Sequence, residues 1–79
     1  MDVKLNLPLE KREEFFLLAS EIFEVERSLL NENTRYGEVS GWDSVNHLRL
    51  VMEAERRFGV SYPLEKIPLM RTLADFFTI

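Results

Sequence analysis

A serine at the start of a predicted helix is the residue best placed for chemistry in this sequence. Ser44 follows Trp42 and Asp43, and apolar residues at helical spacing begin directly after it. The hydroxyl of a serine at the first helical position lies in solvent near free backbone amides, where the helix dipole favours negative charge. Ser44 is therefore a good position for a phosphate ester. The Asp-Ser pair by itself favours plain helix capping over a phosphate ester, since such pairs start helices in many proteins.

His47 suggests a different chemistry, because it is the only histidine and lies one turn after Ser44. A serine nucleophile with a histidine base also needs an orienting group and an oxyanion hole, and the sequence offers no clear candidate for either. We therefore expect no catalytic residue. Glu53 and Glu55 point in different directions on a helix, and the chain has no cysteine, so we also expect no metal site.

The first element that must position Ser44 is a helix from about Leu9 to about Glu26. Pro8 suits the start of a helix, and apolar residues follow at helical spacing. A long run of turn-forming residues then separates this helix from Ser44, and such loops are often functional or anchored by their own side chains. The expected anchors of the loop are Leu29, Leu30 and Tyr36.

The second helix has the clearest boundaries. Asp43 can cap its first turn, and Gly59 can close it after Phe58 in the left-handed conformation. A short helical turn is expected over residues 64–66, ahead of Pro68, and a last helix over residues 72–77. The best case for a strand, residues 59–62, is too short.

These elements predict an all-α fold: a small bundle of three main helices plus one short helix, with a long loop between helices one and two. Residues 1–79 are expected to form a single domain, because a chain of this length cannot be subdivided. An apolar fraction of 46% is enough for one core.

Charge and composition limit the partners. The net charge of −4 argues against nucleic acid, which is bound mainly through Lys and Arg. No segment approaches the ~20 apolar residues of a membrane span, and residues 1–7 show no leader, so we expect a soluble, cytoplasmic monomer. The lack of cysteine fits a reducing compartment.

Three motifs, taken in order, resemble the acyl carrier protein family, and the resemblance covers nearly the whole chain. Residues 44–55 are similar to the second helix of that family, where Asp-Ser-Leu marks the modified serine. Phe58-Gly59-Val60 is similar to the ending of that helix, and residues 72–76 to the "Thr-Val-x-Asp" opening of the last helix. The three motifs together are far more specific than the Asp-Ser pair.

The resemblance implies a carrier rather than an enzyme. Ser44, within the motif that includes Asp43, would bear a covalent 4′-phosphopantetheine arm added from coenzyme A by a phosphopantetheinyl transferase. The thiol of the arm would hold acyl groups as thioesters for acyl-loading and acyl-transferring enzymes. We expect those partners to dock on residues near the arm: Trp42, Asp43, Val45, Arg49, Met52 and Glu53.

Departures from the family pattern indicate a specialised pathway, polyketide-like or of another secondary metabolism. Arg49 stands where fatty-acid carriers often have Glu, and Arg56 and Arg57 follow, so the face has mixed charge and would dock weakly to strongly basic enzymes. The Trp-Asp-Ser form resembles discrete carriers that load hydroxy- or alkoxymalonyl, glyceryl or D-alanyl units. The Gly-Gly-x-Ser signature of peptidyl carriers is missing.

Two further expectations concern packing. Trp42 is expected mainly to pack over the loop, which leaves room for a partner contact as well. The resemblance implies that an acyl chain can enter between the second and third helices, within a set otherwise expected to be core: Met52, Phe58, Ile67, Leu69, Met70 and Leu73. The alternative to a carrier is a small helical interaction module without a prosthetic group, docking through its second helix.

Overall fold

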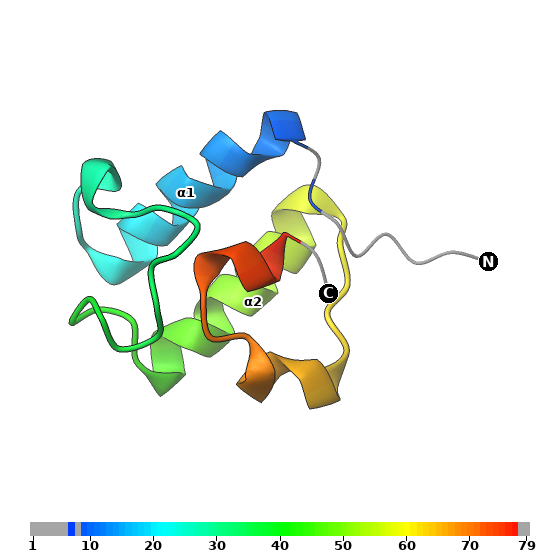
Figure 1. Cartoon of the computed structure of the whole chain (residues 1–79). Coiled ribbons are helices and arrows are strands. Elements are labelled where there is room, and N and C mark those ends of the chain that lie inside the picture. Colours follow the sequence, from blue (N-terminus) through cyan, green and yellow to red (C-terminus); the bar gives the residue numbers. More distant parts are fainter. Residues whose placement is uncertain (1–6, 8, 78–79) are drawn as a thin grey trace.

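The computed structural model describes residue 7 and residues 9–77, and it is helical throughout its regular structure (Figure 1). In this part of the chain there is no strand, only an isolated bridge between Arg35 and Thr72. The all-α class predicted from the sequence is therefore confirmed. The elements, in order, are α1 (Leu9–Phe23), η1 (Arg27–Leu29), α2 (Ser44–Phe58), η2 (Leu64–Leu69) and η3 (Leu73–Phe76), where η marks a 3₁₀-helix.

Two predictions fall on residues that the structure does not describe. They are the start of the first helix at Pro8 and, for residues 1–6, the expected absence of a leader. Within the described residues, no helix is both long and apolar enough to cross a membrane.

The two α-helices run in opposite directions, and the long loop joins them at one end of the molecule (Figure 1). The third wall of the bundle differs from the expected one. Instead of a third helix of useful length, two short 3₁₀ segments, η2 and η3, follow α2, and each contacts His47 of α2 through one residue, Ile67 of η2 and Phe76 of η3.

α1 ends at Phe23, three residues earlier than expected. Glu24 adopts the left-handed conformation with φ of 58°, and the amide of Val25 donates to the carbonyl of Ser20 over 3.1 Å. This six-residue closure satisfies a free carbonyl at the helix end, as in a Schellman motif. The sequence carries no sign of it, because glycine rather than glutamate is the usual residue at that position.

α2 has the predicted ends. The Asp43 carboxylate accepts a 2.9 Å hydrogen bond from the amide of Asn46, and Gly59, with φ of 69°, closes the helix by donating to the Glu55 carbonyl. Arg56 and Arg57 lie in the last turn, where the helix dipole favours positive charge.

The two 3₁₀ segments differ in length from the elements predicted for the C-terminal part: η2 is longer than the turn expected over residues 64–66, and η3 is shorter than the helix expected over residues 72–77. η2 continues through Pro68 because Pro68 occupies the second position of a turn closed by the Met70 amide on the Ile67 carbonyl, where proline needs no amide hydrogen. η3 is one short turn rather than a helix over residues 72–77. Its start is fixed by the Asp75 carboxylate, which accepts from the amides of Arg71 and Thr72 over 2.8 and 3.0 Å.

The core forms where α1, α2 and η3 meet. The Phe15 and Phe76 rings lie 5.2 Å apart at its centre, and Tyr62 donates to the Phe76 carbonyl over 2.9 Å. The largest side chains that are fully buried are Leu7, Phe15, Trp42, Leu50, Leu73 and Phe76.

The long loop is held by backbone pairing with the C-terminal segment. The Tyr36 amide donates to Arg71 over 2.7 Å, Leu73 donates to Thr34, and Ala74 donates to Glu32. Leu30 and Tyr36 contribute to the core as predicted, whereas Leu29 is 62% exposed and anchors nothing.

Arg27 ties η1 back to α1. Its guanidinium forms two hydrogen bonds with the Glu13 carboxylate, at 2.7 and 2.8 Å, and lies 4.2 Å from the centre of the Phe16 ring. The same hydrogen bonds lower the pKa of Glu13 and raise that of Arg27. Both groups are therefore charged near neutral pH.

Candidate functional site

Ser44 is the first residue of α2 and its side chain is exposed. The first amides of a helix have no intrahelical partner. The Asp43 carboxylate accepts a hydrogen bond from the Asn46 amide. The amides of Ser44 and Val45 remain as donors beside the Ser44 hydroxyl. The position predicted from the sequence thus has the exposure and the local donors that a phosphodiester needs.

The start of α2 is fixed against the end of α1 by two residues that the sequence analysis did not single out for this role. A side chain at Gly41 would place its Cβ 2.0 Å from the Phe23 carbonyl oxygen, so only glycine fits there. The Asn46 side chain donates to the Gly41 carbonyl over 2.8 Å. The sequence offers no signal for this close approach, because Gly41 is typical of any turn and Asn46 is an ordinary polar residue inside a helix.

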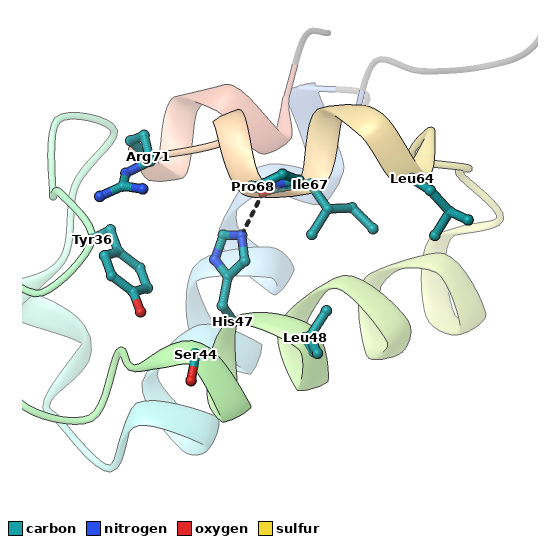
Figure 2. A pocket seen from close by; sticks show the side chains of 8 residues that line it. All are labelled: Tyr36, Ser44, His47, Leu48, Leu64, Ile67, Pro68 and Arg71. Atoms are coloured by element: carbon teal, nitrogen blue, oxygen red, sulfur yellow. Dashed lines mark hydrogen bonds between the residues drawn. The ribbon is translucent and has the colours of Figure 1, made fainter.

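Trp42 and His47 form a buried pair behind Ser44. The indole N–H of Trp42 donates to Nδ1 of His47 over 2.9 Å, and Nε2 of His47 lies 2.8 Å from the Ile67 carbonyl oxygen (Figure 2). Because Nδ1 accepts, Nε2 carries the hydrogen and donates to Ile67. Both ring nitrogens are therefore engaged, and neither faces Ser44 as a free base.

Aromatic stacking fixes this pair in place. The Trp42 ring stacks on Phe23 with centroids 5.2 Å apart, and the His47 ring lies nearly parallel to the indole at a centroid distance of 6.0 Å. Tyr36 packs edge-on against both Trp42 and His47. Trp42 is only 1% exposed, which confirms the expectation that its side chain packs in the interior. The expectation that this side chain also contacts a partner is wrong, because it does not reach the surface.

The outer face of α2 carries apolar side chains in solvent. Val45 is 66% exposed and Met52 is 65% exposed, with Leu48 between them. The expectation that Met52 belongs to the core is wrong, since the inward side of α2 is filled by His47, Leu50, Val51 and Ala54. The same expectation is wrong for Leu69, which ends η2 and is 66% exposed.

The remaining residues expected at the docking surface also lie on or before α2. Asp43 and Arg49 are exposed, and Glu53 is half-buried. Glu53 pairs with Arg56 at 2.5 Å and with Arg57 at 3.9 Å, while Arg49 has no carboxylate partner among the described residues. The face near Ser44 therefore offers apolar contacts bordered by charges of both signs.

Glu53 and Glu55 diverge as predicted. Glu53 turns to Arg56, whereas Glu55 accepts from the Tyr62 amide over 2.9 Å. In the part of the chain that is described, no three His, Cys, Asp or Glu side chains come together as metal ligands.

A pocket of about 420 Å³ lies between the start of α2 and η2, and Ser44 is on its rim (Figure 2). This volume is within the range of small-ligand sites, roughly 300–1,000 Å³. Most of its wall is apolar. The lining residues are Tyr36, Ser44, His47, Leu48, Leu64, Ile67, Pro68 and Arg71.

No protein-family model matches this chain, and no curated protein is significantly similar to it in sequence.

Proposed function

We propose that this chain is an acyl carrier protein whose Ser44 bears 4′-phosphopantetheine. One observation carries the proposal: Ser44 is exposed at the first position of a capped helix, on the rim of a pocket with apolar walls. The three motifs that resemble the family add to it.

The modification that this geometry suits is a single substitution at phosphorus. The Ser44 oxygen attacks the phosphate that bears pantetheine in coenzyme A and forms a phosphodiester. Adenosine 3′,5′-bisphosphate leaves, and the hydroxyl proton passes to the transferase. Ser44 needs no base within this chain for that step, which agrees with both ring nitrogens of His47 being engaged.

In this proposal, the residues around Ser44 divide into two groups by role. Asp43 and Asn46 hold the first turn of α2, and the arm extends from that turn. Val45, Arg49, Met52 and Glu53 contact the transferase and the acyl-handling enzymes through weak, transient interfaces. The acyl group shelters against the apolar walls of the pocket, as the family resemblance implies.

The mixed charges on this face favour partners of a specialised biosynthetic pathway over strongly basic fatty-acid enzymes. Arg49 is the main reason, because it places a positive charge next to Val45 and Met52. Among the described residues, no carboxylate pairs with Arg49. We place the carrier in the cytoplasm and regard it as a monomer.

The proposal is tested by intact-protein mass spectrometry after incubation with coenzyme A and a broad-specificity phosphopantetheinyl transferase. We expect a gain of one phosphopantetheinyl group in the wild type and none in Ser44→Ala. Because the Ser44 side chain is exposed, Ser44→Ala should keep the wild-type circular dichroism and melting temperature. A folded wild-type protein that gains no mass would contradict the proposal.

A second candidate, an interaction module without a prosthetic group, is favoured by the exposed apolar side chains of α2. Contiguous exposed apolar surface marks interaction sites in many proteins. Ser44→Ala separates the two candidates, since only the carrier loses its function through loss of this hydroxyl.

A further inference from the structure

The pocket beside Ser44 has two chemically different ends. Figure 2 shows Leu64 at one end and Arg71 with Tyr36 at the other, with Ile67 and Pro68 between them. Leu64 and Leu48 remain largely exposed, so an apolar ligand that covered them would bury surface that solvent now contacts. This end suits a hydrocarbon chain.

Arg71 makes the other end positive. Its guanidinium carbon lies 4.8 Å from the centre of the Tyr36 ring, in a cation–π arrangement. A guanidinium stacked on a ring still directs its N–H groups outward, in the plane that suits a carboxylate or phosphate. Tyr36 thus covers one face of the guanidinium, and the N–H groups at its edge remain available for a ligand at this end of the pocket.

The charge of Arg71 is not neutralised within the described residues. Asp75, the acidic residue four positions later, uses its carboxylate on the backbone amides of Arg71 and Thr72 rather than on the guanidinium. No other carboxylate in that part of the chain forms an ion pair with Arg71.

The backbone of Arg71 is fixed on both sides, so the guanidinium starts from a defined position. Its amide donates to Asp75, and its carbonyl accepts from the Tyr36 amide over 2.7 Å. Tyr36 in turn packs edge-on against Trp42 and His47, which are both buried. The Tyr36 ring under Arg71 is thus partly buried and packed against the core.

We propose that Arg71, stacked on Tyr36, binds an anionic oxygen group of the ligand in this pocket, so that a ligand with a negative charge is preferred over a neutral ligand of the same shape. This inference rests on the proposed function in one respect, namely that the ligand is supplied by the acylated arm on Ser44. The anion is then either a carboxylate on the acyl group or the phosphodiester of the arm.

The two sources are distinguished by loading Ser44 with three arms: unacylated phosphopantetheine, a malonyl thioester and an isovaleryl thioester. Isovaleryl has the shape of malonyl with an isopropyl group in place of the carboxylate, so it is the neutral match. The readouts are the NMR signal of the Arg71 Nε–H group, the ³¹P signal of the arm and the rate of thioester hydrolysis.

A carboxylate ligand predicts that the Nε–H signal shifts in the malonyl form only. It also predicts that Arg71→Gln hydrolyses the malonyl thioester roughly fivefold faster than the wild type, as expected for one charge-assisted contact near the surface, with isovaleryl unchanged. A phosphate ligand predicts the same Nε–H shift in all three forms and a changed ³¹P signal in Arg71→Gln. No shift in any form, with equal hydrolysis rates, would overturn the proposal.

Arg57→Gln is the matched control, because it removes the same charge from the far end of α2. It should leave all three readouts at wild-type values. A response equal to that of Arg71→Gln would mean that net charge alone is measured, which would also overturn the proposal.

Failure of the arm to attach would contradict the proposed function but not this inference, which is then tested on the unmodified chain with free probes. Hexanoate should bind roughly fivefold more tightly than hexanol by NMR titration, and Arg71→Gln should remove the difference. Equal binding of the two probes by the wild type would overturn the inference.

Discussion

The inner and outer faces of α2 carry side chains with opposite surroundings. On the inner face, His47, Leu50, Val51 and Ala54 are all buried, and both ring nitrogens of His47 have partners. On the outer face, Val45 and Met52 are mostly in solvent. The inner face therefore holds Ser44 in position, whereas the outer face is the one that we propose for partner contacts, so fold and function should be separable by mutation.

Removal of His47 is expected to have the largest effect on the inner face of α2. His47→Ala leaves the Trp42 N–H and the Ile67 carbonyl unpaired in the core and opens a cavity, so we expect a loss of about 4 kcal/mol in the free energy of unfolding. Urea denaturation followed by circular dichroism measures it. A loss below about 1 kcal/mol would show that the inner face does not hold the helix.

The buried phenol of Tyr62 makes the stability of the core depend on pH. Burial, with a smaller contribution from Glu55, raises the pKa of Tyr62 above its ordinary value of 10.0. The unfolded chain therefore ionises first. The stability from the neutral phenol is complete below pH ~10 and is lost as pH rises toward the folded pKa, by up to about 1.4 kcal/mol per pH unit.

Tyr62→Phe should remove this contribution. At pH 7 it should cost about 1 kcal/mol, because the Phe76 carbonyl loses its 2.9 Å hydrogen bond. Between pH 10 and 11, urea denaturation should show a shallower fall in stability for the variant than for the wild type. Equal slopes would mean that the phenol ionises alike in both states.

The smallest effect on stability is expected on the outer face. Met52→Ala should change the free energy of unfolding by less than about 0.5 kcal/mol, since the side chain is 65% exposed. If partners dock there, the rate of arm transfer to Ser44 should nevertheless fall, by roughly fivefold for the loss of one apolar contact. Mass spectrometry under limiting transferase measures that rate.

Leu50→Ala provides the matched control on the inner face. Leu50 is fully buried, and we expect a loss of about 3 kcal/mol without a specific effect on arm transfer in the protein that remains folded. If Met52→Ala proved as destabilising as Leu50→Ala, the separation of the two faces would be wrong.

Local interactions along the chain define the elements that could be predicted from the sequence. Asp43 and Gly59 set the ends of α2 through a side-chain cap and a left-handed residue, and both act within one turn of the chain. The all-α class and the place of Ser44 at the start of α2 follow from the same local signals.

The tertiary structure alone decided which apolar residues were buried and what surrounded Ser44. Met52 and Leu48 have the same local character as Val51, but of the three only Val51 is buried, because the burial of a side chain depends on what packs against the helix. The early end of α1 at Glu24 also carried no sequence signal. The pocket with Arg71 at its rim joins residues of the loop, α2 and η2 that lie far apart in the sequence, so no local pattern could reveal it.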